Sequence, residues 1–123
     1  ASWAALCPGH HESAGKHKSG KTRKGNRWLR TALIEAAAGA SRAKHSALQA
    51  RFRRILHHRG PKKAVVGLAH ALLRIAYHVL AHGTTYQELG GDYYDRRNTQ
   101  RVTRRAIRLL EGQGYRVTLE PAA

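Results

Sequence analysis

The sequence of 123 residues contains one cysteine, no methionine and three prolines. A single cysteine can form no disulfide within the chain and cannot supply a cysteine-rich zinc site, so we expect a reducing compartment, the cytoplasm. Acidic residues are also few, and they are scattered: Glu12, Glu35, Glu88, Asp92, Asp95, Glu111 and Glu120. Because no acidic cluster could hold two magnesium ions, the sequence argues against a self-contained metal nuclease.

Long hydrophobic runs are also missing. The stretches free of Asp, Glu, Lys and Arg fall short of the ~20 apolar residues that a membrane-spanning helix needs, so we expect no membrane partner. Hydrophobic residues make up 41% of the chain, and 20 of them are alanine. With so few large side chains, close packing of helix on helix is the expected way to form a core.

Positive charge is abundant. The 23 Lys and Arg residues exceed the 7 Asp and Glu residues by 16, an excess that repels itself unless a polyanion screens it. The cations fall in three blocks, 16–30, 51–63 and 96–108, which lack the apolar helix face of a membrane-surface segment. We therefore expect a nucleic-acid partner, bound by Lys16, Lys18, Lys21, Arg23, Lys24, Arg27, Arg30, Arg54, Lys62, Lys63, Arg104 and Arg105.

Apolar residues spaced three and four apart predict a mainly α fold with about four helices. The expected helices, with their capping or breaking residues, are Asn26 to Gly39, Ser41 to Gly60, Pro61 to Gly83, and Asn98 or Thr99 to Gly112. Thr85-x-x-Glu88 resembles a capping box for one further turn of helix. The aromatic pair Tyr93-Tyr94 is expected in a loop or lid.

The two ends of the chain lack helix signals. Residues 8–27 are rich in glycine and cations, which predicts a basic loop with little means of packing on itself. Residues 115–119 alternate as one short C-terminal strand would, and a single strand must pair with a segment absent from this sequence, with another copy of the chain, or with nothing. We therefore interpret residues 1–123 as a single domain and as a fragment of a longer protein.

Two motifs in the basic loop suggest other functions. Residues 15–22 match the phosphate-loop pattern G-x-x-x-x-G-K-[ST], but no buried strand precedes them. Zinc could be bound by Cys7, His10, His11 and His17, but four ligands in a known spacing are missing, so we expect no metal. On the third expected helix, His70, Arg74 and His78 share one edge and are secondary candidates.

Ser13 is the candidate nucleophile. It precedes Ala14-Gly15-Lys16, where small residues permit close approach of the backbone. A serine hydroxyl can attack a phosphodiester, form a phosphoserine link and release a sugar hydroxyl that can reverse the step. The cations Lys16, Arg23, Lys24 and Arg27 are near enough in sequence to stabilise the developing charge. By residue type alone, a cap or a turn is the commoner role of a loop serine.

Three runs, Trp3 to Pro8, Glu12 to Lys16 and Arg23 to Leu33, resemble the C-terminal transposase domain of the insertion sequence 110/116/902 family, which includes bridge-RNA-type serine recombinases. The likeness continues through residues 69–78, 93–95 and 110–121, and so covers nearly the whole chain. Its most specific element is Ser-x-Gly-Lys followed by Lys-Gly-Asn-x-x-Leu-Arg. Ala5 stands where the family often has glycine.

This resemblance implies a DNA transposase in which Ser13 cleaves and exchanges DNA strands. It also implies an N-terminal RNase H-like domain that binds Mg²⁺ and is missing here, an element-encoded guide RNA in some members, and a homo-oligomer of the intact protein. Residues 1–123 alone are then expected to be incomplete or inactive, with no cofactor of their own. The alternatives are a non-catalytic basic nucleic-acid-binding module and a phosphate-loop nucleotide-binding protein.

Overall fold

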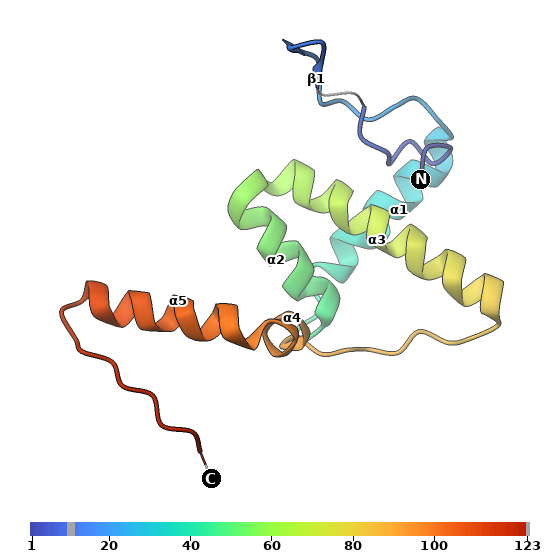
Figure 1. The fold of residues 1–123 in the computed structure, drawn as a ribbon. Helices are drawn as coiled ribbons and strands as arrows, with labels where there is room; N and C mark the ends of the chain where they lie inside the picture. Colours follow the sequence, from blue (N-terminus) through green and yellow to red (C-terminus); the bar gives the residue numbers. More distant parts are fainter. Residues whose placement is uncertain (10–11, 123) are drawn as a thin grey trace.

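The computed structural model describes residues 1–9 and 12–122. In chain order the elements are β1 (Glu12–Ser13), β2 (Lys16–His17), α1 (Arg27–Ala40), α2 (Ala47–Arg59), α3 (Pro61–His82), α4 (Tyr93–Arg97) and α5 (Thr99–Gly112), as Figure 1 shows. The mainly α prediction is confirmed. Two details are wrong. A fifth, short helix covers the expected Tyr93-Tyr94 loop. The expected C-terminal strand at residues 115–119 does not form, and the two strands of the described chain lie near the N-terminus.

The start and stop signals of the helices are mostly those predicted. The Asn26 side chain accepts a hydrogen bond from Leu29 N at 2.9 Å and so begins α1. Ser41 does not begin α2; it ends α1, and its N–H bonds to the carbonyl oxygen of Ala37. Ser46 caps α2 instead, accepting from Gln49 N at 3.0 Å. The extra turn between the two serines includes His45 at φ 57°, a conformation that no pattern in the sequence indicates.

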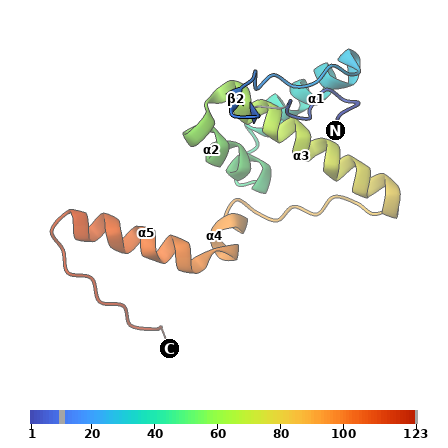
Figure 2. The same ribbon diagram turned by 45° about the horizontal axis from the view of Figure 1, so that its top comes forward.

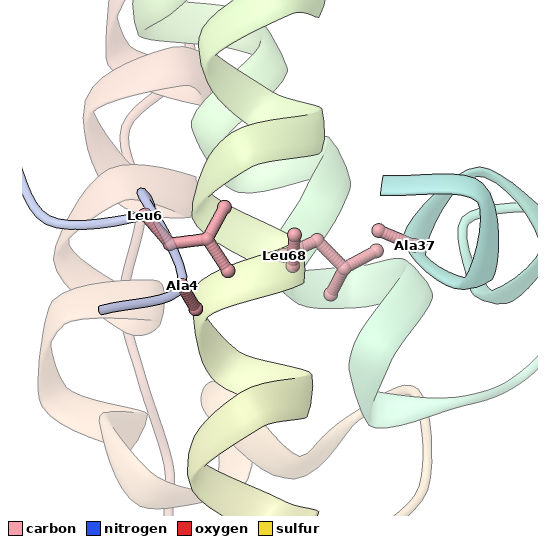
Figure 3. Packing of buried hydrophobic residues seen from close by; sticks show 5 residues of the cluster. Ala4, Leu6, Ala37 and Leu68 are labelled. Atoms are coloured by element: carbon pink, nitrogen blue, oxygen red, sulfur yellow. The ribbon is translucent and has the colours of Figure 1, made fainter. Parts of the chain in front are cut away.

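The core lies where α3 meets α1 and the N-terminal segment. Its buried side chains are Ala4, Leu6, Ala37, Leu68 and Ala69, and Figure 3 shows Leu68 pointing toward Ala37 of α1 while Ala4 and Leu6 lie against the same helix α3. Alanine and glycine at these contacts let the helix backbones approach closely, as the composition predicted. On the α2 side, a Cβ on Gly67 would lie 2.9 Å from Cδ1 of Ile55.

Helix α3 is also the most apolar element. With 22 residues, α3 is long and apolar enough to cross a membrane by length and composition. Lys62, Lys63 and Arg74 interrupt it, so it contains no charge-free stretch of that length. The core helix of a protein passes the same test, and α3 packs against both α1 and α2. The expectation of no membrane partner therefore stays a prediction.

We call α1–α3 the three-helix body. The chain that follows α3 extends away from this body. Helix α5 follows α4 at the far end of the molecule from the N-terminal strands, and the C-terminal residues continue beyond it without packing back (Figures 1 and 2). The accessible surface is 10145 Å², against ~6,600 Å² for a compact monomer of this mass. Much of the described chain thus lies outside a packed core.

Candidate nucleic-acid interface

The candidate nucleophile lies on a β-hairpin. Strands β1 and β2 are antiparallel, with Ser13 directly opposite Lys16 and Glu12 opposite His17. The two-residue turn has positive φ at both positions, 50° at Ala14 and 73° at Gly15, as a type I′ turn requires. Side chains directly opposite each other share one face of a hairpin, so the Ser13 hydroxyl and the Lys16 ammonium emerge on the same side. All four strand residues are exposed.

Backbone hydrogen bonds pair the two segments that connect the hairpin to the helical body. Gly9 N donates to Lys21 O at 3.0 Å, and Arg23 N donates to Cys7 O at 3.2 Å. Nearer to α1, Asn26 N donates to Trp3 O at 2.6 Å. A Cβ on Gly25 would overlap the Trp3 carbonyl oxygen, so only glycine fits there. The basic loop is therefore more ordered than the sequence predicted.

The first turn of the chain places Ala5 in a backbone conformation that favours glycine, the residue often found there in the family that the sequence resembles. Ala5 has φ 55° and is buried, a backbone conformation that glycine adopts at less cost. The flanking side chains of Ala4 and Leu6 are buried in the core. Burial of these neighbours holds Ala5 in its strained conformation and fixes where the hairpin leaves the body.

Most of the predicted phosphate-binding cations are exposed. Around the hairpin these are Lys16, Lys18, Lys21, Arg23, Lys24 and Arg27, whereas Arg30 is partly buried. In the first turn of α3, Lys62 and Lys63 are exposed. Neither α1 nor α3 has an acidic residue in its first turn, where the helix dipole favours anions and disfavours cations. The cations at these two helix N-termini therefore have no acidic residue in the same first turn to balance them.

The structure does not unite all these cations in one patch. Arg104 and Arg105 are exposed on α5, which lies at the opposite end of the molecule from the hairpin (Figures 1 and 2). Arg54 on α2 is between them, 3.8 Å from the carboxylate of Asp95 and with its guanidinium 5.1 Å from the ring centre of Tyr94. The predicted phosphate-binding cations thus fall in two basic regions separated by the body.

The structure bears on the phosphate-loop match and on part of the candidate zinc site. Residues 15–22 form the second half of the hairpin, and α1 begins only at Arg27, so the strand–loop–helix geometry of a phosphate loop is missing. For zinc, His10 and His11 lie outside the described residues. Within the described ranges no group of three metal-ligating side chains is present.

Glu88 has a role that the sequence did not indicate. Residues 84–90 form no helix, so the capping-box prediction at Thr85 is wrong. The Glu88 carboxylate instead accepts from Ala47 N at 2.7 Å and caps α2 from 41 residues away. This bond, and a second one from Gly90 N at 3.0 Å, hold the pKa of Glu88 below its ordinary value. Burial, together with the hydrogen bond to Glu88, raises the pKa of Tyr86 to about 12.

The secondary candidates on α3 do not form a catalytic set. His70 is partly buried, and burial followed by the charge of Arg74 lowers its pKa. His78 is exposed, and its carbonyl oxygen lies 3.1 Å from Nδ1 of His82. Arg74 and His78, but not His70, line a cavity with a group that the sequence did not indicate, Arg51 and the tyrosines of residues 86–94.

Comparison with known proteins agrees with the hairpin and helix-start motifs. Residues 1–53 match the family described as Transposase IS116/IS110/IS902 family. A curated relative, named "Putative transposase y4pF/y4sB" from Sinorhizobium fredii, is 33% identical over 98 residues, which is 74% of this chain and 25% of the relative. The chain thus spans about a quarter of that protein's length. No solved structure matches. The chain is therefore similar to transposases of this family, most clearly across the hairpin, α1 and the start of α2.

Proposed function

We propose that this chain is the part of a DNA transposase that supplies a serine nucleophile and grips the nucleic acid around it. The observation that carries the proposal is the pairing of Ser13 with Lys16 across the hairpin, within a segment that matches a transposase family. The hairpin projects from the body, so a DNA backbone can reach Ser13 without unfolding any helix.

The chemistry is a transesterification. The Ser13 oxygen forms a bond to phosphorus while the bond from phosphorus to one sugar oxygen breaks, and the released sugar oxygen takes up a proton. Lys16, on the same face, stabilises the negative charge on the phosphoryl oxygens as the hydroxyl proton is removed. Attack by the sugar hydroxyl of another strand on the phosphoserine reverses the step and completes strand exchange.

The wider assembly is proposed from the family resemblance, and the relative's greater length leaves room for a further domain. The intact protein would add a Mg²⁺-binding RNase H-like domain, act as a homo-oligomer on paired DNA ends in the cytoplasm, and in some cases use an element-encoded RNA. This chain's own residues would then hold the phosphate and supply the nucleophile, and the metal would assist from the other domain.

Replacement of Ser13 tests the catalytic role. In the intact protein, Ser13→Ala should abolish the covalent protein–DNA adduct, detected by denaturing electrophoresis of a labelled DNA end, and should leave DNA affinity within about twofold. Ser19→Ala is the matched control, because Ser19 is an exposed serine of the same loop. An adduct that survives in Ser13→Ala refutes Ser13 as the nucleophile.

Salt dependence tests the binding role, which the non-catalytic alternative shares. If about six phosphates are neutralised, log affinity for duplex DNA should fall with log salt at a slope of roughly −5. Changing Lys16, Lys18 and Lys21 together to Gln should reduce the slope by about 3. A flat salt response would contradict nucleic-acid binding, and normal binding without any adduct would favour the non-catalytic module.

A further inference from the structure

A cavity of about 240 Å³ lies between α2, α3 and residues 86–94. Three tyrosines line it, Tyr86, Tyr93 and Tyr94, over an apolar floor that includes Leu48 and Ile75. The rings of Tyr93 and Tyr94 meet edge to face, with centres 5.1 Å apart. The volume is below the ~300–1,000 Å³ of pockets for drug-sized ligands. It suits one flat ring system rather than a base pair.

The two permanently charged groups that line this cavity are both cations. Arg51 and Arg74 line it beside His78, and no carboxylate is among its lining residues. Arg51 is held by one long hydrogen bond, from its guanidinium to the hydroxyl of Tyr94 at 3.4 Å. Its Nε is buried and has no partner within the described chain. A half-buried guanidinium with one buried, unsatisfied donor is stabilised when an anion binds its remaining N–H groups.

The wall of the cavity is fixed in place. The Tyr86 hydroxyl donates to Glu88 at 3.1 Å, and Glu88 is itself bonded to the start of α2. These bonds engage the Glu88 carboxylate, and among the described residues it forms no ion pair with Arg51 or Arg74. Aromatic faces beside unpaired cations are the elements that hold unpaired nucleotides, because every base can stack and every phosphate is an anion.

We propose that this cavity binds a single unpaired nucleotide, with its base against the tyrosines and its phosphate on Arg51 and Arg74. The inference rests on the nucleic-acid binding proposed above but not on catalysis by Ser13. It adds a site in the body that would recognise a flipped or bulged nucleotide, separate from the duplex contacts of the hairpin. The strand could be DNA or RNA, since base and phosphate are common to both.

The test uses the 123-residue chain and duplexes that carry one bulged 2-aminopurine, whose fluorescence falls when it stacks on an aromatic ring. We expect quenching by the unaltered chain. Tyr86→Ala and Tyr94→Ala should weaken binding of the bulge by about tenfold, since one base–aromatic stack is worth ~1–3 kcal/mol. Tyr94→Phe keeps the ring and should retain the quenching. Tyr115→Ala is the control, because Tyr115 is exposed outside the cavity.

The phosphate contact is tested by Arg51→Gln against Arg59→Gln, which removes the same charge from the exposed end of α2. Only Arg51→Gln should weaken binding of the bulge beyond the small loss common to both. Circular dichroism checks that each variant is folded. Tighter binding of a deoxyribose or a ribose bulge supports the proposal in either case and identifies the natural strand.

The proposal is overturned if the cavity variants bind the bulge as the unaltered chain does, or if they weaken a fully paired duplex equally. Failure of the transposase proposal looks different, because it shows as a missing Ser13 adduct or as duplex binding that is insensitive to salt. The two proposals can therefore fail separately.

Discussion

Helix α3 of the three-helix body and helix α5 each carry an apolar stripe, although α5 is richer in arginine, and the two helices bury very different amounts of that stripe. In α3, Ala64, Leu68 and Ala69 are buried. In α5, no residue is buried within the described structure, and Leu109 is 62% exposed. The difference is one of neighbours: α3 packs against two helices, whereas α5 meets only the short helix α4 closely. An apolar stripe stabilises a fold only where another element covers it.

The sharpest way to break this comparison is to truncate one leucine in each region. Leu68→Ala should lower the free energy of unfolding by ~2–4 kcal/mol, because the side chain is fully buried between packed helices. Leu109→Ala on α5 should change it by less than ~0.5 kcal/mol. Urea unfolding followed by circular dichroism measures both. Equal losses would mean that α5 packs on the body in solution.

A smaller change in the free energy of unfolding is expected at Glu88, in the segment between α3 and α4. Glu88→Gln removes the charge that caps α2, and should cost ~0.5–1 kcal/mol at neutral pH after allowance for solvent screening. The folded pKa of Glu88 lies below its unfolded value, so its contribution is present above about pH 4.5 and is lost as pH falls through the folded pKa.

The measurement is the difference in unfolding free energy between Glu88→Gln and the unaltered chain across acid pH. It should shrink toward zero as the solution becomes more acidic. Glu111→Gln on α5 is the control, since Glu111 is exposed and caps no other helix. A difference that is independent of pH would contradict the capping role.

The smallest expected effect uses two glycines near helix ends. A Cβ on Gly39 of α1 or on Gly112 of α5 would meet nothing within 4 Å. Gly39→Ala should therefore stabilise the chain by ~0.5 kcal/mol through helix propensity. Gly112→Ala should raise the helix content of α5 without moving the unfolding midpoint of the body. Thermal unfolding compares the two variants, and an equal rise in midpoint would show that the three-helix body and α5 unfold as one unit.

The helices could be predicted from sequence because their caps are local. Asn26 and Pro61 begin helices, and Gly83 ends one, through bonds or dihedral angles that involve neighbouring residues. The choice of Ser46 over Ser41 could not be predicted, since both precede an apolar run. The hairpin was missed because its Ala-Gly turn is not one of the strong two-residue turn signals.

The candidate site could be predicted only in part, for the same reason. Ser13 and its neighbouring cations are close in sequence, so a motif could identify them. Their pairing across a turn depends on strand register, which the two-residue turn at Ala14-Gly15 fixes, and the Ala-Gly sequence does not signal that turn. The cavity that joins Arg51 to Tyr94 was not predicted, because 43 residues separate the two and no periodic pattern links them.

The sequence by itself determined the charge, the helix boundaries set by local caps, and the small residues that let α1 approach α3. Tertiary structure alone decided which apolar faces are covered, that Glu88 caps a helix far away in sequence, and that three tyrosines line one cavity together with Arg51. Local bonds form within a few residues and leave a pattern in the sequence, whereas contacts between distant segments depend on how the whole chain packs.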